Sequence, residues 1–244
     1  MEAIMKKIPK KIILCAGAVI LLFCTAISVY GILTAPESDQ NELEEELRRN
    51  EQELAESESV TPDAITPADV GETAKPDNAT ATVKPKKKSI SVIGDSVFLG
   101  AAPSFRKIYK NAVVDAKISR QVYQGLDVAK KLKKKGKLGD IVIISLGING
   151  PFNEVTGQEL IDYLGKERTV YWINAYGKKL AWQKEVNKTI QRLVDKNENL
   201  RLILWSKEGE KHPDWFYQDG THLNTKGQNG FSQFVKDEIE KDGN

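Results

Sequence analysis

Three stretches of this 244-residue chain carry side chains suited to acyl chemistry. Gly94-Asp95-Ser96 offers a hydroxyl nucleophile, and Gly147-Ile148-Asn149-Gly150 offers an amide donor. Asp219-Gly220-Thr221-His222 offers a carboxylate three residues before a histidine. A serine needs a base to take its proton, and the base needs an acceptor that fixes its tautomer. Because Asp219 and His222 share a glycine-containing turn, a hydrogen bond between their side chains is sterically feasible.

The composition excludes several other kinds of site. The two cysteines, Cys15 and Cys24, both lie near the N-terminus, so the large C-terminal part has no disulfide and no cysteine-based metal site. With only His212 and His222 in the sequence, a histidine-rich metal centre is excluded as well. His212 stands in Lys-His-Pro-Asp and is expected to lie in an exposed turn.

The elements that must position these side chains alternate along the chain. Short apolar, β-branched runs are typical of strands covered on both faces, and helical patterns lie between them. Such alternation predicts a parallel sheet with helices on both faces. The expected strands are Ser89–Ile93, Ala112–Ala116, Asp140–Leu146, Thr169–Asn174 and Leu200–Trp205, and the expected helices are Val97–Tyr109, Gln121–Lys135, Trp182–Val194 and Lys226–Lys241.

Each reactive stretch follows one of the expected strands. Ser96 comes after the first strand and directly before a helix, whose N-terminus supplies backbone N–H groups and partial positive charge. Asn149 follows the third strand, and Asp219 and His222 follow the fifth. Sites in parallel sheets form at the carboxyl ends of the strands. Gly-Asp-Ser alone is as typical of a helix N-cap, so the assignment depends on the three stretches occurring together.

The first 35 residues have the pattern of a cytoplasmic basic flank and a transmembrane anchor. Four lysines among the first eleven residues precede an uncharged run from Ile12 to Ala35. Its apolar part, residues 12–33, would be ~33 Å long as a helix, enough to cross a ~30 Å hydrocarbon core. Lysines before the run and acids after it predict that the rest of the chain is extracytoplasmic. A cleaved signal peptide, which would make the protein secreted, is the rival interpretation.

Residues 36–88 are expected to form a spacer between the anchor and a catalytic domain at 89–244. Residues 41–57 are rich in glutamate, with Leu43, Leu47 and Leu54 at near-heptad spacing. This pattern favours a solvated single helix, with a short coiled coil as the alternative. The remainder, rich in Pro, Thr, Ala and Asp without hydrophobic periodicity, is expected to be disordered.

The charge is distributed unevenly along these segments. Residues 1–36 carry a net charge of +3, residues 37–78 carry −11, and residues 79–244 carry +10. The basic C-terminal part favours anionic surroundings such as cell-wall polymers. Nucleic acid is not an expected partner, because the predicted topology places this part outside the cell.

The three motifs resemble those of the SGNH hydrolases, also called GDSL enzymes, a superfamily of lipases and esterases. Ser96 matches the nucleophile motif, Asn149 the oxyanion motif, and Asp219 with His222 the acid and base motif. The resemblance covers roughly residues 89–240 and is greatest to the extracellular C-terminal domain of peptidoglycan O-acetyltransferases of the OatA type. It implies a three-layer α/β/α sandwich of flavodoxin-like type with a mainly parallel five-stranded sheet.

The resemblance also implies where an oxyanion would be held. The Ser96 amide and the Asn149 side chain would donate to it, and Gly147 belongs to the same substrate-binding motif. The family's glycine motif falls near Ser119 and Arg120, where this sequence has no glycine. A backbone N–H of Ser119 or Arg120 is expected to take its place.

The implied reaction moves an acetyl group through an acetyl-serine onto a muramic acid hydroxyl of peptidoglycan, with no metal or organic cofactor. Only one hydrophobic span is present here, so the donor would be a separate multi-span membrane acyltransferase. An extracellular carbohydrate or lipid esterase with the same triad is the alternative. A membrane-tethered wall-binding module without catalysis is the alternative from another class.

Overall fold

The computed structural model describes residues 39–59 and 88–243. The described residues from Leu43 onward belong to one compact unit, and residues 39–42 belong to another. The apolar run at 12–33 and most of the expected spacer lie outside the described residues. Within the described ranges, no helix combines the length and the apolarity needed to cross a membrane.

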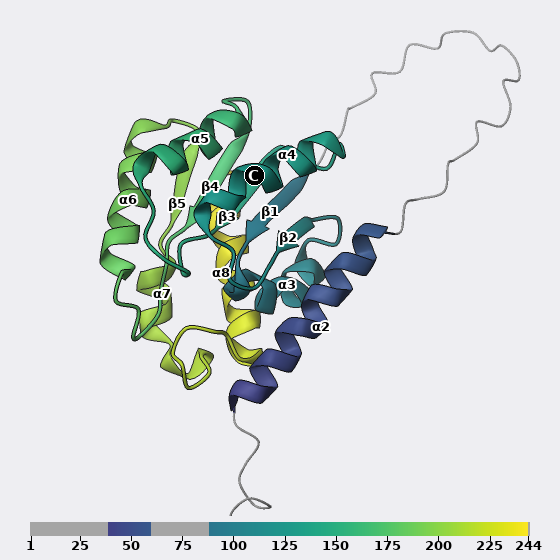
Figure 1. Ribbon diagram of the computed structural model, residues 1–244, viewed down its shortest axis with the longest axis vertical. Coiled ribbons are helices and arrows are strands. Elements are labelled where there is room, and N and C mark those ends of the chain that lie inside the picture. The colour runs from purple at the N-terminus through teal and green to yellow at the C-terminus, as the bar shows by residue number, and fades with distance from the viewer. Residues whose placement is uncertain (1–38, 60–87, 244) are drawn as a thin grey trace, which may run out of the picture. The chain divides into compact units, whose positions relative to one another are not determined.

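Five parallel strands form a single sheet in the order β2-β1-β3-β4-β5 (Figure 1). All five expected strands are confirmed, with their ends shifted by one or two residues. Every residue of β1 and β3 is buried and most are apolar, because helices cover both faces of these central strands. The strands are β1 (Ile90–Gly94), β2 (Val113–Ala116), β3 (Ile141–Ser145), β4 (Thr169–Ile173) and β5 (Leu200–Ile203).

Helices cover both faces of the sheet and complete three layers (Figure 1). On one face, α3 (Ser96–Ile108) packs against α8 (Thr225–Lys241). On the other face, α5 (Glu154–Leu164) packs between α4 (Gly125–Lys134) and α6 (Gln183–Lys196). The remaining short helices are η1 (Val122–Gln124), α7 (Trp205–Lys211) and η2 (Pro213–Trp215).

Aromatic rings fill the layer between α3, α8 and the sheet. The Phe98 and Phe231 rings meet edge to face at 5.7 Å, and Phe231 meets Trp205 in the same way at 4.8 Å. Edge-to-face pairs add to the stabilisation from area burial. Trp205, the last residue of an expected strand, instead begins α7 and is buried.

The helix α2 (Asp39–Ser59) coincides with the glutamate-rich stretch. Leu43, Leu47 and Leu54 are buried and belong to the same hydrophobic core as the residues of the sheet. Their spacing of four and seven places them on one helical face. That face packs on the domain, rather than on water or on a second helix as the sequence suggested, while the glutamates of the opposite face remain exposed.

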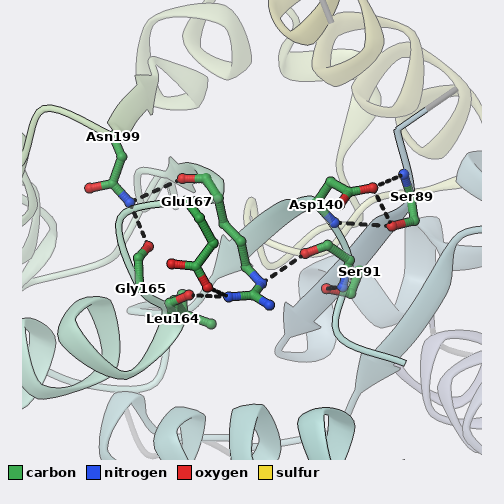
Figure 2. Close-up of polar contacts among 9 residues, drawn as sticks. Ser89, Ser91, Asp140, Leu164, Gly165, Glu167 and Asn199 are labelled. Carbon is green, nitrogen blue, oxygen red and sulfur yellow. Dashed lines mark hydrogen bonds and ion pairs between the residues drawn. The ribbon is translucent and has the colours of Figure 1, made fainter. Parts of the chain in front are cut away.

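A polar network fixes the edge of the sheet where the strands begin (Figure 2). The Asp140 carboxylate accepts hydrogen bonds from the Ser89 amide at 2.9 Å and the Ser89 hydroxyl at 2.8 Å. The Asn199 side chain donates to the carbonyls of Gly165 and Arg168. The opposite edge, where the strands end, carries the reactive residues.

Candidate active site

Ser96, His222 and Asp219 form one hydrogen-bonded chain. The Ser96 Oγ lies 2.9 Å from His222 Nε2, and His222 Nδ1 lies 2.5 Å from an Asp219 carboxylate oxygen. With the ring proton on Nδ1, His222 donates to Asp219 and accepts from Ser96. Ser96 is only 4% exposed, whereas the side chains of His222 and Asp219 are 24% and 31% exposed. The serine is therefore nearly closed off from solvent, whereas the histidine and the aspartate are partly exposed.

The turn between β1 and α3 presents Ser96. The Asp95 carboxylate caps the helix by accepting from the Val97 amide at 3.1 Å. Because α3 begins at Ser96, the Ser96 amide has no acceptor within the helix and is available at its N-terminus. The turn lies where strand order reverses between β1 and β3, which is where ligands bind in open parallel sheets.

The turn that carries Asp219 and His222 is closed by its own backbone. Asp219 accepts from the amides of Thr221 at 2.8 Å and His222 at 3.0 Å. Gly220 has a φ of +68°, a conformation that glycine adopts without a Cβ penalty. Burial raises the pKa of Asp219, but the hydrogen bonds from His222 and Thr221 outweigh it and hold the pKa below its usual value. Asp219 is therefore a carboxylate at neutral pH.

Asn149 and the loop after β2 lie on either side of the serine turn. Their strands, β3 and β2, flank β1, and the Asn149 side-chain amide donates to the Arg120 carbonyl at 3.1 Å. That bond uses one of the two amide hydrogens of Asn149. Gln121 reinforces the contact by donating to the Asn149 carbonyl at 2.7 Å.

Ser119 occupies the left-handed conformation, with a φ of +59°, and is the one non-glycine residue with positive φ among the described residues. This backbone shape is the one that glycine adopts most readily, so the loop keeps a glycine-like conformation without a glycine. The Arg120 amide donates back to the Lys117 carbonyl at 3.4 Å. Of the two expected donors, the Ser119 amide is therefore the better placed for an external acceptor.

The Arg120 side chain has a structural task that the sequence did not reveal. Its guanidinium is buried and donates to the carbonyl of Gly94, at the end of β1, and to the carboxylate of Asp115, at 2.9 and 2.6 Å. Burial raises the pKa of Asp115, but Lys131 and Arg120 outweigh it and keep the pKa below its usual value. This ion-pair network fixes the loop of Ser119 relative to the serine turn.

Gly147 also has a packing role. Its φ of +130° and its closeness to α6 leave no room for a side chain, because a Cβ would lie 2.8 Å from Val186 Cγ1. The residue therefore shapes the backbone that leads from β3 to Asn149.

Asp95, which precedes the serine, carries a buried carboxyl group. Burial raises its pKa to about 7, against the lowering influence of the Val97 and Ile148 amides and of His222 and Arg120. Those two amides belong to the serine turn and to the loop of Asn149. Asp95 thus links the two loops, a role that the Gly-Asp-Ser pattern suggested only in part, as a helix cap.

The raised pKa of Asp95 predicts a pH-dependent stability. Unfolded Asp95 releases its proton near pH 3.8 and folded Asp95 near pH 7, so between these values the folded state holds more protons and loses stability as pH rises. At ~1.4 kcal/mol per unit, the free energy of unfolding should fall by about 3 kcal/mol more in the wild type than in Asp95→Asn between pH 5 and 8. Denaturant unfolding at both pH values measures this difference, and equal changes in the two proteins would contradict it.

His212, the other histidine of the sequence, lies in aromatic packing. The His212 ring stacks on Trp215 at 3.9 Å, and its Nε2 lies 3.2 Å from Glu208. Trp215 also stacks on Trp205, and Phe216 is buried. His212 is therefore held in a separate cluster and takes no part in the hydrogen-bonded chain of Ser96.

Together, this arrangement offers a nucleophile with a base in contact, a carboxylate on the far side of the base, and amide donors around the serine. These are the groups that acyl transfer through a covalent intermediate requires.

The chain is similar in sequence to proteins named as O-acetyltransferases. The O-acetyltransferase OatA of Staphylococcus aureus (strain NCTC 8325) is 32% identical over 151 residues, which cover 62% of this chain and 25% of that protein. The matched curated relatives are much longer, and the chain spans about a quarter of their length. No family model matches the chain.

Solved structures share the fold. The C-terminal catalytic domain of Streptococcus pneumoniae peptidoglycan O-acetyltransferase A, solved with a methylsulfonyl adduct, superposes with a TM-score of 0.57 at 17% identity, covering 63% of this chain and 93% of that domain. A GDSL-like lipase candidate from Parabacteroides merdae superposes with a TM-score of 0.50 at 14% identity, covering 61% and 94%. The resemblance expected from the motifs is confirmed.

Proposed function

We propose that the globular part of this chain, which is similar to peptidoglycan O-acetyltransferases in sequence and in fold, is an SGNH/GDSL-type domain that transfers acetyl groups to a cell-wall glycan. The observation that carries the proposal is the hydrogen-bonded chain of Ser96, His222 and Asp219 at the switch point of the sheet. The similarity to proteins named O-acetyltransferases supports the acetyl group and the glycan acceptor.

In the first step, Ser96 becomes acetylated. As the Ser96 Oγ bonds to the carbonyl carbon of an acetyl donor, its proton passes to His222 Nε2. The bond between that carbon and the leaving oxygen of the donor then breaks, and His222 returns the proton to the leaving oxygen. Asp219 holds the imidazole in the required tautomer and stabilises the imidazolium that forms.

The oxyanion of each tetrahedral intermediate would be held by three donors. These are the amide of Ser96, the amide of Ser119 and the second side-chain amide hydrogen of Asn149. Each such donor contributes about 3–4 kcal/mol to transition-state stabilisation. Asp95 and Arg120 support them by holding the loops together.

In the second step, an acceptor hydroxyl takes the acetyl group. His222 removes the hydroxyl proton as the oxygen attacks the acetyl carbon, and Ser96 leaves with a proton from His222. A muramic acid hydroxyl gives transfer, whereas water gives hydrolysis. Transfer therefore requires that the glycan occupy the site and exclude water.

The proposed location is the outer face of the cell membrane. The lysine flank and the apolar run at 12–33 support a single-pass anchor with the domain outside. A multi-span membrane acyltransferase would deliver the acetyl group from the cytoplasm to Ser96.

The proposal is tested with the purified full chain in detergent, an activated acetyl ester and a peptidoglycan oligosaccharide. Mass spectrometry should detect an added acetyl group on the glycan, and the Ser96→Ala protein should give none. An enzyme that releases only free acetate, at a rate unaffected by glycan, would be an esterase instead. A wild-type chain without any Ser96-dependent turnover would support the non-catalytic wall-binding module.

A further inference from the structure

The segment Leu43–Ser59 of α2, here called the strap helix, is joined to the catalytic domain by more than hydrophobic packing. Leu47 lies over α3 at Gly100, where an added Cβ would be 3.7 Å from Leu47 Cδ2. Asn50 is only 3% exposed and donates to the carbonyls of Leu99 and Gly100 at 3.2 and 3.5 Å. A helix that only spaced the domain from a membrane would need none of these buried polar contacts.

The contact of Asn50 replaces a hydrogen bond that α3 lacks. Pro103 lies inside α3 and has no N–H, so the carbonyl of Leu99, four residues earlier, has no helical donor. The Asn50 side chain supplies that donor from the strap helix. Because α3 begins at Ser96, the strap helix is coupled to the helix that carries the proposed nucleophile.

Glu46 couples the strap helix to the opposite part of the site. One oxygen of its carboxylate accepts from the Tyr217 hydroxyl at 2.9 Å, and the other accepts from the Gln228 side-chain amide at 2.5 Å. A charged acceptor shared by two donors holds both in a fixed geometry. Gln228 is 5% exposed, so its amide is held away from bulk water.

Both partners of Glu46 hold the backbone at His222 and at the residue that follows it. The Tyr217 amide donates to the His222 carbonyl at 2.9 Å. The Gln228 side-chain amide, besides contacting Glu46, donates to the Leu223 carbonyl at 3.2 Å. Glu46 therefore contacts two residues that each donate a hydrogen bond to a backbone carbonyl in the turn of the base. The two carbonyls, those of His222 and Leu223, are adjacent.

We propose that Glu46 is a positioning residue for His222. In this proposal the strap helix contributes to the active site, because it holds α3, which begins at Ser96, and the turn of His222 in a fixed relative position. This inference rests on the proposed function of Ser96 and His222. The expected consequence is kinetic: without the Glu46 carboxylate, the turn relaxes and the imidazole is held less well against Ser96. Small misplacements of catalytic groups reduce rates steeply.

The test measures turnover of an activated acetyl ester by the purified full chain. Glu46→Ala should lower kcat by about tenfold with little change in KM, and should slow the acylation of Ser96 by a sulfonyl fluoride to the same degree. Tyr217→Phe, which removes one hydroxyl, should lower kcat as well. The double variant should lose less than the product of the two single losses, because both act through one contact.

Glu45→Ala is the matched control, since Glu45 is the exposed neighbour of Glu46 on the same helix. It should leave kcat unchanged, and melting temperatures separate a loss of fold from a loss of positioning. An active wild type with Glu46→Ala and Tyr217→Phe both at the wild-type rate would overturn the inference. A wild type without Ser96-dependent turnover would instead overturn the proposed function.

Discussion

Replacing Ser96 by alanine should reduce acetyl transfer and ester turnover by about 10³-fold or more, the loss expected when a member of a catalytic triad is removed. The reason is that the Ser96 hydroxyl is the group that would carry the acetyl, and alanine has no oxygen to replace it. A loss of this size corresponds to ~4 kcal/mol of transition-state free energy. Initial rates with an activated acetyl ester measure it.

Folding should be unaffected by Ser96→Ala. The helix cap is provided by Asp95 rather than Ser96, and the described contact of the Ser96 hydroxyl is with His222. Circular dichroism and the melting temperature of the variant should match the wild type. Activity of the variant comparable with the wild type would end the acetyl-serine mechanism.

Replacing His222 by alanine should reduce activity by a similar factor, about 10³-fold. Without the imidazole, the Ser96 proton has no base, and Asp219 is separated from the serine by the gap that the ring leaves. The double variant should lose about as much activity as either single variant, because Ser96 and His222 act as one unit. Rates of the two single variants and the double variant test this.

His212→Ala provides the matched control, because His212 is the second histidine of the chain and packs on Trp215 away from Ser96. Its activity should remain near that of the wild type. If His212→Ala lost as much activity as His222→Ala in a protein of unchanged melting temperature, the base would be wrongly assigned.

The strands could be predicted because each is a short, mainly apolar run, and the central strands β1 and β3 are buried on both faces. Of the α-helices, α5 and the short α7 were missed. In α5, Gly157 is a weak helix former and obscures the amphipathic pattern of the buried face. That glycine is required by packing, since a Cβ would lie 2.4 Å from Leu193 Cδ1. This requirement comes from α6, far along the chain, and is not visible locally.

The candidate site was predictable where its geometry is local. Asp219 and His222 are three residues apart and close one turn, and Ser96 and Asn149 lie in the turns that follow β1 and β3. The supporting residues were not predictable, because their contacts connect distant parts of the sequence. Arg120 reaches back to Gly94, and Glu46 reaches Gln228, 182 residues later.

The same limit explains the strap helix. Three leucines and many glutamates specify an amphipathic helix. Their spacing does not tell whether the apolar face packs on another part of the same chain or on a second helix. The structure answers this with Asn50, whose partner is a carbonyl freed by Pro103.

The central claim, that an acetyl group passes from Ser96 to a glycan, is tested most directly by following the acetyl-serine itself in the acetyl-transfer experiment. The full chain is acetylated with a limiting amount of activated ester, and intact-protein mass spectrometry follows the loss of the acetyl group from Ser96. The account predicts that a peptidoglycan oligosaccharide accelerates this loss and that the acetyl group appears on the glycan. Discharge at the same rate with and without glycan, yielding only acetate, would contradict it.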